Sequence, residues 1–303
     1  MNPPLPPASE VAPRDPAAPP PAHPGPGPAP GPLRGLPVRT ASAAVLLVVV
    51  AVVLLAGGVP LAVLVGVAAA LAAWELRALL QRLPAEAPLW LVGGLAVWLA
   101  ERPVLPGPAG NTGLILAAAV LGGVVAGVLL RVPWSGWAAG IAGGVYLGIG
   151  LGSLLALDHW PGAGPDEGVR ILAVVIGAVI ATDTLAYFTG MAVGRHRHPF
   201  FPSLSPRKSR EGAIGGVLGA VAVAGVAGTL WLGLGTGLAV GLGLAVGIAA
   251  EAGDLAESAL KRQAGVKDSG RLIPGHGGLL DRIDSLLLAG AAAYVLLLLA
   301  GFH

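Results

Sequence analysis

The side chains most suited to chemistry gather in residues 267–284, which read KDSGRLIPGHGGLLDRID. The segments on both sides are almost entirely Ala, Leu, Val and Gly, so hydrophobic packing does not explain the polar cluster. Asp281 and Asp284 lie three residues apart at the start of an apolar run, and on a helix they would share one face. Carboxylates of this kind suit a hard divalent cation such as Mg²⁺, which also binds substrate phosphates.

A second acidic group lies near the end of the preceding apolar run. Glu251 lies three residues before Asp254, Glu257 and Ser258 follow it at three and four, and Lys261 follows at seven. On a helix all of them share one face. Acids at membrane depth are costly and usually face a cavity, a partner or a metal. We therefore expect two helices to bring their carboxylates together, although Glu257 and Lys261 are also spaced as an ordinary surface ion pair.

Basic residues and glycines accompany these acids in two loops, 191–211 and 257–284. The glycines of PGHGG, residues 274–278, permit tight backbone geometry, and His276 is suited to bind phosphate or to assist proton transfer. Acids, basic groups and Gly-rich turns together indicate phosphoryl or nucleotidyl transfer. The basic side chains in question are Arg207, Lys208, Arg210, Lys261, Arg262, Lys267 and Arg282.

Three smaller features leave alternatives open. Asp183, inside an otherwise apolar run, is either a satisfied buried polar group or a site residue. The RHRH stretch at 195–198 has the residue types of a metal site, but histidines beside arginines in a loop are more often solvated, and we favour that interpretation. Ser205 and Pro206 have the composition of a simple turn.

The composition predicts an all-α polytopic integral membrane protein. The 303 residues are 55% hydrophobic and only 11% charged, whereas soluble domains carry about 25% charged residues. The chain has no cysteine, which excludes disulfides, thiolate metal sites and a cysteine nucleophile. The positive net charge is only +2, and we expect the partners to be the lipid bilayer and small substrates, with no nucleic acid.

Nine apolar runs are long enough, or nearly so, to be transmembrane helices. A cytoplasmic N-terminus followed by nine spans places every Lys and Arg except Arg102 and Arg170 on the cytoplasmic side, as the positive-inside rule requires. Two spans separate the two basic loops, so both loops lie on one side. The expected spans are about 41–57, 59–80, 87–100, 112–130, 134–157, 170–190, 212–232, 236–256 and 285–301.

Residues 1–40 are dominated by Pro, Ala and Gly, and we expect a disordered cytoplasmic tail rather than a cleavable signal peptide. Residues 41–303 would then form one transmembrane domain, with its catalytic part at about 170–290. The expected location is the cell membrane, with the site facing the cytoplasm.

The segment from Ser258 to Asp284 resembles the signature of the phosphatidate cytidylyltransferases, also called CDP-diacylglycerol synthases. The preceding Gly253-Asp254 and the stretch DTLAY at 183–187 are similar to further elements of that family. SPRKSREG at 205–212 resembles its S-P-K-K-T-x-E-G, with Arg in place of Lys and Ser in place of Thr. The resemblance covers residues 140 to 303. Every fixed position of the signature is present: Ser258, Lys261, Arg262, Lys267, Asp268, Pro274, Gly275, His276, Gly277, Gly278, Asp281, Arg282 and Asp284.

The resemblance implies the transfer of CMP from CTP to phosphatidate, which gives CDP-diacylglycerol and pyrophosphate. It implies that Asp254 and Asp281 hold Mg²⁺, with room for a second metal ion, and it suggests a homodimer. The residues that it assigns to catalysis are Asp254, Lys261, Arg262, Lys267, Asp268, His276, Asp281, Arg282 and Asp284. The residues that it assigns to substrate binding are Asp183, Ser205, Arg207, Lys208, Ser209, Glu211, Ser258, Gly277 and Gly278.

Other functions remain open from sequence alone. The CDP-alcohol phosphotransferase pattern is absent. A cytidylyltransferase for another lipid phosphate, such as an isoprenoid-ether phosphate, would carry the same motif, because the motif recognises the phosphate and not the lipid tail. An ion-coupled transporter would place its acids near mid-bilayer and would show inverted repeats. Here most acids lie at one rim, and no repeat is evident.

Overall fold

The computed structural model describes residues 36–83, 86–105, 133–194 and 198–302, with isolated residues between 113 and 129. Within these residues the chain is helical, and its only β-type pairings are two isolated bridges. The α-helices are α1 (Leu36–Ala56), α2 (Gly58–Leu80), α3 (Leu89–Glu101), α5 (Trp134–Asp158), α6 (Pro165–Thr189), α7 (Arg210–Leu232), α8 (Thr236–Gln263) and α9 (Leu280–Leu299).

Six of the described helices, α2 and α5 to α9, are long and apolar enough to cross a membrane. The prediction of an all-α chain with several membrane-spanning helices is therefore confirmed. Helix α3 has only 13 residues, and the apolar part of α1 is also short. The expected span at 112–130 and most of the Pro-rich tail lie outside the described residues, so the count of nine spans and the orientation stay predictions.

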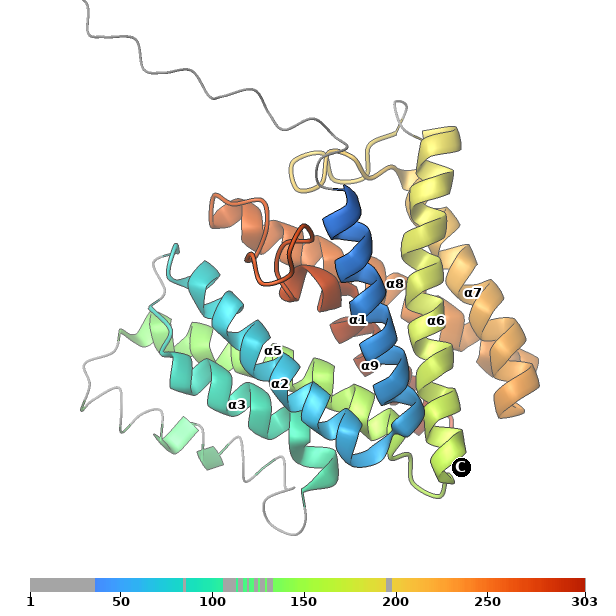
Figure 1. Ribbon diagram of the computed structural model, residues 1–303, viewed down its shortest axis with the longest axis horizontal. Helices are drawn as coiled ribbons and strands as arrows, with labels where there is room; N and C mark the ends of the chain where they lie inside the picture. Colours follow the sequence, from blue (N-terminus) through green and yellow to red (C-terminus); the bar gives the residue numbers. More distant parts are fainter. Residues whose placement is uncertain are drawn as a thin grey trace, which may run out of the picture.

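The helices form two groups that α9 joins (Figure 1). Helices α2, α3 and α5 pack against one another, and α6, α7 and α8 form the second group. Helix α9 lies against both α5 and α8, while α1 crosses the front of the molecule and packs mainly on α2. Large apolar side chains such as Val48, Leu55, Leu218 and Leu230 are exposed on α1 and α7, as lipid-facing surfaces require.

Glycines allow the close helix contacts that define this bundle. Gly140, Gly144, Gly148 and Gly152 form one stripe on α5, and a Cβ on any of them would lie 2.9 Å or less from an atom of α3 or of its leucines. A side chain at these positions would therefore separate the two helices. This is the small-residue packing that membrane helices use when lipid provides no hydrophobic drive between them.

The two polar loops lie at the same end of the molecule as the start of α1 (Figure 1). The Ser42 hydroxyl on α1 donates to the Pro274 carbonyl oxygen at 3.0 Å and lies 3.0 Å from Nδ1 of His276. At the opposite end, the Trp160 indole donates to the Phe302 carbonyl oxygen. The described parts of loops 191–211 and 257–284 thus lie at one end of the helix bundle, and their shared membrane side stays a prediction.

Candidate active site

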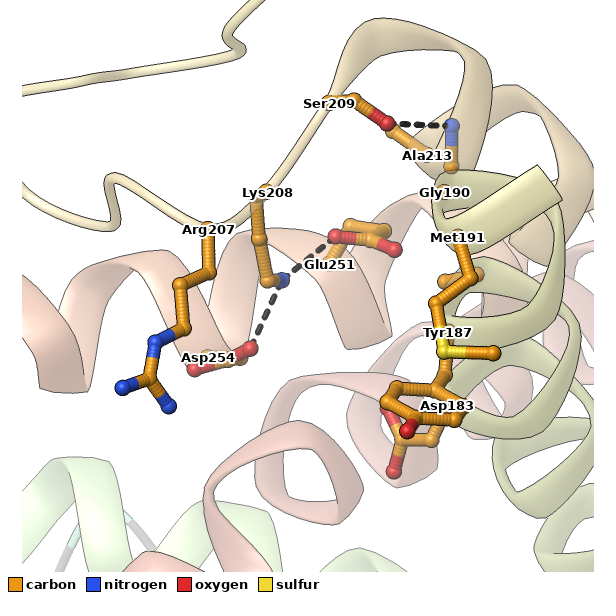
Figure 2. Close-up of a pocket in the computed structure, with 12 residues that line it drawn as sticks. Asp183, Tyr187, Gly190, Met191, Arg207, Lys208, Ser209, Ala213, Glu251 and Asp254 are labelled. Carbon is orange, nitrogen blue, oxygen red and sulfur yellow. Dashed lines mark hydrogen bonds and ion pairs between the residues drawn. The ribbon is translucent and has the colours of Figure 1, made fainter. Parts of the chain in front are cut away.

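A cavity of about 450 Å³ opens between α6, the loop before α7, and α8. Lys208 lines this cavity. The Lys208 ammonium lies 2.6 Å from a carboxylate oxygen of Glu251 and 2.6 Å from one of Asp254 (Figure 2). The two acids are three residues apart on α8, so one lysine can reach both. The expected alignment of acids on a single helical face is confirmed here.

Lys208 keeps its positive charge in this setting. Burial, the largest single influence, lowers the pKa of its ammonium, but the carboxylates of Asp254 and Glu251 together raise it above its ordinary value of 10.5. A donor that is charged at neutral pH therefore stands at the cavity wall.

Further polar groups line the same cavity. Arg207 is exposed and extends toward the side of the cavity where Asp254 lies, and Asp183 faces the cavity from α6 together with Tyr187 (Figure 2). Asp183 is thus a cavity residue, as the site interpretation expected, and not a satisfied group inside the helix core. Guanidinium and ammonium groups side by side are suited to bind a polyphosphate.

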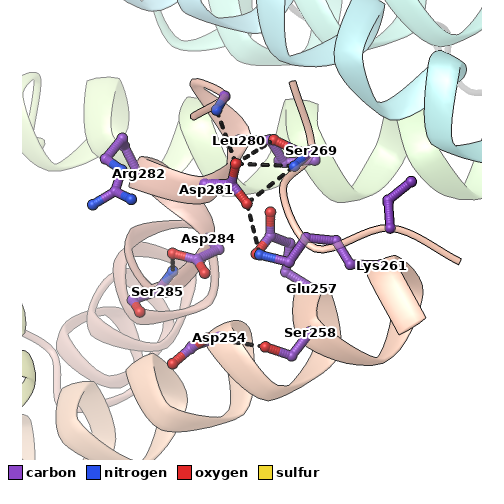
Figure 3. A network of polar contacts seen from close by, with 12 residues as sticks. Asp254, Glu257, Ser258, Lys261, Ser269, Leu280, Asp281, Arg282, Asp284 and Ser285 are labelled. Carbon is purple, nitrogen blue, oxygen red and sulfur yellow. Dashed lines mark hydrogen bonds and ion pairs between the residues drawn. The ribbon is translucent and has the colours of Figure 1, made fainter. Parts of the chain in front are cut away.

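A second network has Lys261 at its centre. Its ammonium donates to Oδ1 of Asp281 at 2.6 Å and is also in ion-pair contact with Glu257 (Figure 3). All three side chains are nearly buried. The alternative of an ordinary surface pair between Glu257 and Lys261 is therefore wrong, because α8 continues to Gln263 and its last turns pack against α9 instead of facing water.

Asp281 accepts hydrogen bonds on both carboxylate oxygens. Oδ2 accepts from the Ser269 amide at 2.9 Å, the Ser269 hydroxyl at 3.0 Å and the Gly278 amide at 2.8 Å. Oδ1 accepts from Lys261 and, at 3.2 Å, from the Ser269 amide. These donors fix the carboxylate in one orientation at the start of α9.

The two networks meet where α8 and α9 approach each other. A Cβ on Gly253 would lie 2.4 Å from the backbone oxygen of Asp284, so only glycine permits this approach. Asp254 and Asp284 consequently lie within electrostatic range of each other, and the Ser258 hydroxyl donates to Asp254 at 3.3 Å. Asp284 is buried, and its own carboxylate accepts from the Ser285 amide.

The PGHGG loop is a tight turn, as expected. The Ile273 amide donates to the Gly277 carbonyl oxygen, and the His276 amide donates to the Ile273 carbonyl oxygen, both at 2.9 Å. Gly275 and Gly277 have φ angles of 77° and 91°, which other residues rarely adopt. His276 faces Ser42 rather than the acids, so the structure places it at the edge of the site.

The remaining expected residues have local partners or face solvent. The Ser209 hydroxyl caps α7 by accepting from the Gly212 amide, Ser205 lies in the expected turn, and Glu211 contacts His198, the described residue of the RHRH stretch. Arg262 donates to the Val266 carbonyl oxygen and Arg282 to that of His276. Lys267 and Asp268 are exposed beside the turn that leads to Gly277 and Gly278.

The carboxylates of Asp254 and Asp281 are of the right chemical type to bind a metal ion, but the structure does not bring them together as a metal site. Within the described residues, no group of three or more His, Cys, Asp or Glu side chains is arranged to hold a metal ion. Carboxylate oxygens suit Mg²⁺, and the side chain of Asp254 is 30% exposed. Asp281 is occupied by protein donors, so Lys261 would have to leave Oδ1 before Asp281 joined Asp254 on one cation.

Sequence reasoning missed two residues that contact the site segment. Glu75 on α2 is buried, and its carboxylate accepts from the backbone amides of Leu279 and Leu280. Ser269 contacts both Glu75 and Asp281. An acid inside an apolar run is a visible signal for Glu75, as it is for Asp183.

Comparison with known proteins identifies the group to which this architecture belongs. The profile of the cytidylyltransferase family matches residues 37–300, which include every described helix apart from the first residue of α1. The chain belongs to the cytidylyltransferase family. This membership of the cytidylyltransferase family confirms the resemblance seen in the sequence, and it stands against the ion-coupled transporter.

Individual relatives of this cytidylyltransferase carry more specific names. A phosphatidate cytidylyltransferase of Brucella abortus biovar 1 is 38% identical over 194 residues, which are 61% of this chain and 69% of the relative. A phosphatidate cytidylyltransferase of Mycobacterium tuberculosis is 35% identical over 135 residues, 45% of this chain and 40% of the relative. The chloroplastic phosphatidate cytidylyltransferase 4 of Arabidopsis thaliana is 39% identical over 138 residues, 45% and 33% of the two chains.

Proposed function

We propose that this cytidylyltransferase transfers CMP from CTP to phosphatidate and releases CDP-diacylglycerol and pyrophosphate, a step in phospholipid synthesis. The observation that carries the proposal is the meeting of two lysine–carboxylate networks on α8, beside a cavity with Arg207 and Lys208 in its wall. The names of the relatives support the same reaction.

The reaction needs positioning and charge stabilisation more than a protein nucleophile. An oxygen of the phosphatidate phosphate attacks the α-phosphorus of CTP, and a new P–O bond forms. The bond from that phosphorus to the bridging oxygen breaks, and pyrophosphate leaves with the electron pair. The lipid phosphate is already ionised, so no strong general base is required. The catalyst must supply positive charge that stabilises the negative charge of the leaving pyrophosphate.

Arg207 and Lys208 are placed to supply that charge. In the structure Lys208 is shared between Glu251 and Asp254, and the arriving phosphates would compete with these carboxylates for its ammonium. Lys261 is held by Asp281 and Glu257 on the other side of Asp254. We assign the triphosphate of CTP to the cavity.

The metal remains part of the proposal. Mg²⁺ held by Asp254 and Asp281 would supply further neutralisation of phosphate charge. Asp254 is the ligand within reach of the cavity, and Asp281 would join it after Lys261 moves away. The protein's own contribution is to hold Asp254 on α8 and Asp281 at the start of α9, near the point where Gly253 lets the two helices approach closely.

We further propose that the site faces the cytoplasm at the membrane rim, in the cell membrane. CTP is available on that side, and the basic loops favour it by the positive-inside rule. The start of α1 lies at the same end as both site loops, as the predicted cytoplasmic N-terminus requires. Helices α6 to α9 present exposed apolar surface, so a lipid substrate can approach from the bilayer.

A direct turnover assay tests the proposal. The full chain is purified in detergent and supplied with Mg²⁺, labelled CTP and dioleoyl phosphatidate, and both products are measured. We expect equal amounts of CDP-diacylglycerol and pyrophosphate, lost on chelation and restored by Mg²⁺. Asp254→Asn should abolish turnover, and Arg210→Ala, at the first residue of α7 and outside the cavity, should not.

The assay also separates the alternatives. Turnover of an isoprenoid-ether phosphate but not of phosphatidate would move the chain to another lipid substrate. Absence of both turnover and CTP binding by the folded protein would overturn the cytidylyltransferase assignment for this site. Full turnover in the presence of chelator would remove Mg²⁺ from the proposal and leave the reaction in place.

A further inference from the structure

Glu75 is a buried acid on α2, far from the site segment in sequence and only 1% exposed. Its Oε1 accepts from the Leu279 amide at 3.1 Å, and its Oε2 accepts from the Leu280 amide at 2.8 Å and from the Ser269 hydroxyl at 3.2 Å. Among the described residues no Lys, Arg or His forms an ion pair with it. The first amides of α9 therefore offset its charge, as the positive end of a helix does.

Glu75 and Asp281 divide three consecutive amides between them. The Gly278 amide donates to Asp281, and the next two, of Leu279 and Leu280, donate to Glu75. The Ser269 hydroxyl lies between the two carboxylates, 3.2 Å from Glu75 and 3.0 Å from Asp281. One hydroxyl has one hydrogen, so the two carboxylates share a single donor, and the position of Ser269 depends on both acids.

The loop backbone is packed against the Glu75 carboxylate from two directions. A Cβ on Gly270 would lie 2.3 Å from Oε1, and a Cβ on Gly278 would lie 2.6 Å from Oε2. Both glycines belong to the segment that also carries Asp281, and no larger residue would fit beside the carboxylate at these positions. A shift of Glu75 would consequently move the turn at Ser269 and the start of α9 together.

We propose that Glu75 is a positioning residue for the transfer reaction: it sets the orientation of Asp281 and, through Asp281, the ammonium of Lys261. This inference rests on the proposed function for its effect on turnover, but its structural part can be tested without turnover. Glu75 belongs to α2, outside the 258–284 signature, so it connects the first helix group to the catalytic segment of the second.

Glu75→Gln is the first variant, since it keeps the shape of the side chain and removes its charge. An amide offers one acceptor oxygen where the carboxylate offers two, so at least one of the three donors loses its partner. We expect kcat to fall about 10- to 100-fold, the usual effect of losing a supporting hydrogen bond behind a site residue. KM for CTP should change less than about threefold, because Glu75 does not line the cavity with Lys208.

Glu101→Gln is the matched control. Glu101 is an acid of the same helix group, and it lies on α3 with its carboxylate beside Gly66 of α2. Gly66 is about 13 Å from Glu75 along the axis of α2 at the ordinary helical rise. The substitution removes a comparable charge but touches no part of the 264–280 loop. Its kcat should stay within about twofold of the parent's.

A double-mutant cycle with Ser269→Ala separates positioning from general loss of stability. If Glu75 acts through Ser269 and Asp281, the effects of Glu75→Gln and Ser269→Ala on kcat should be strongly non-additive. The pair Glu101→Gln and Ser269→Ala should be additive. Parental kcat in Glu75→Gln, or additive effects in the Glu75 cycle, would overturn the proposal.

Two further measurements cover the remaining outcomes. If Glu75→Gln does not fold, Glu75→Asp keeps the charge and draws the carboxylate back by about 1.5 Å, and parental kcat in this variant would overturn the proposal. Amide hydrogen exchange needs no substrate: residues 278–280 should exchange at least tenfold faster in Glu75→Gln and at the parental rate in Glu101→Gln. A parent without turnover would refute the proposed function, and unchanged exchange would refute the role of Glu75.

Discussion

Lys261 and Asp281 lie 20 residues apart in the chain, yet the ammonium of one donates to the carboxylate of the other at 2.6 Å. The same ammonium contacts Glu257, so a single buried cation balances two acids on two helices. Removing it would leave both carboxylates without a cation in the protein interior, which is much more costly than losing a surface ion pair.

Lys261→Met should therefore destabilise the protein by about 3–5 kcal/mol, in addition to abolishing turnover. Adding Glu257→Gln to Lys261→Met should recover part of that stability, because one of the uncompensated charges is then gone. Denaturant unfolding in detergent measures both effects. Equal stability of Lys261→Met and the parent would contradict the buried ion pair.

Lys208→Ala should weaken the use of CTP, through a KM raised about tenfold or a kcat lowered to a similar degree. The physical reason is the loss of the charged donor at the cavity wall. Arg210→Ala is the matched control, since Arg210 lies two residues away and does not line the cavity. Steady-state kinetics with CTP varied at saturating phosphatidate distinguishes the two variants. If Lys208→Ala and Arg210→Ala had the same kinetics with CTP, Lys208 and the 205–212 segment would not be part of the nucleotide site.

The stability that Lys208 provides should depend on pH in one direction only. The folded-state pKa of its ammonium is raised above 10.5, so the contribution is complete below that value and is lost as pH rises through the raised pKa. The difference in Tm between the parent and Lys208→Met should thus be constant between about pH 7 and 9 and should shrink above about pH 10.5. A difference that grows with rising pH would contradict this linkage.

Gly253→Ala should reduce turnover by at least about tenfold, because the new Cβ would lie 2.4 Å from the Asp284 backbone oxygen and push α9 away from α8. Gly241→Ala is a control on the same helix, where a Cβ would meet nothing within 4 Å. Turnover and Tm are measured for both variants. If Gly253→Ala kept parental turnover, close approach of α8 and α9 would not be needed for the reaction.

The sequence predicted most helices to within a few residues, because apolar runs bounded by Gly, Pro and charged residues show clearly where helices begin and end. The exception that matters is α8, whose expected membrane span ends near residue 256 and whose helix ends at Gln263. Its last turns are polar, so hydropathy alone ended the span too early. The extra turns carry Glu257, Ser258 and Lys261 into contact with α9.

The site was predictable where spacing within one helix decided the geometry, as for Glu251 and Asp254, which share Lys208. It was less predictable where partners come from distant segments. Nothing in the spacing of Asp281 shows that Ser269 and Gly278 would occupy its oxygens. The contact of Glu75 with Leu280 joins residues 205 positions apart, and only the packed helices bring them together.

Helix α8 has 28 residues without a break, and both lysine networks are attached to it. Glu251 and Glu257 are separated by about 9 Å along its axis. A helix bends little over so short a distance. A tilt of α8 that breaks the Lys208 contacts would therefore also shift Glu257 and Lys261. If product leaves from the Lys208 end, the resulting tilt of α8 would also displace the contacts of Lys261 with Glu257 and Asp281.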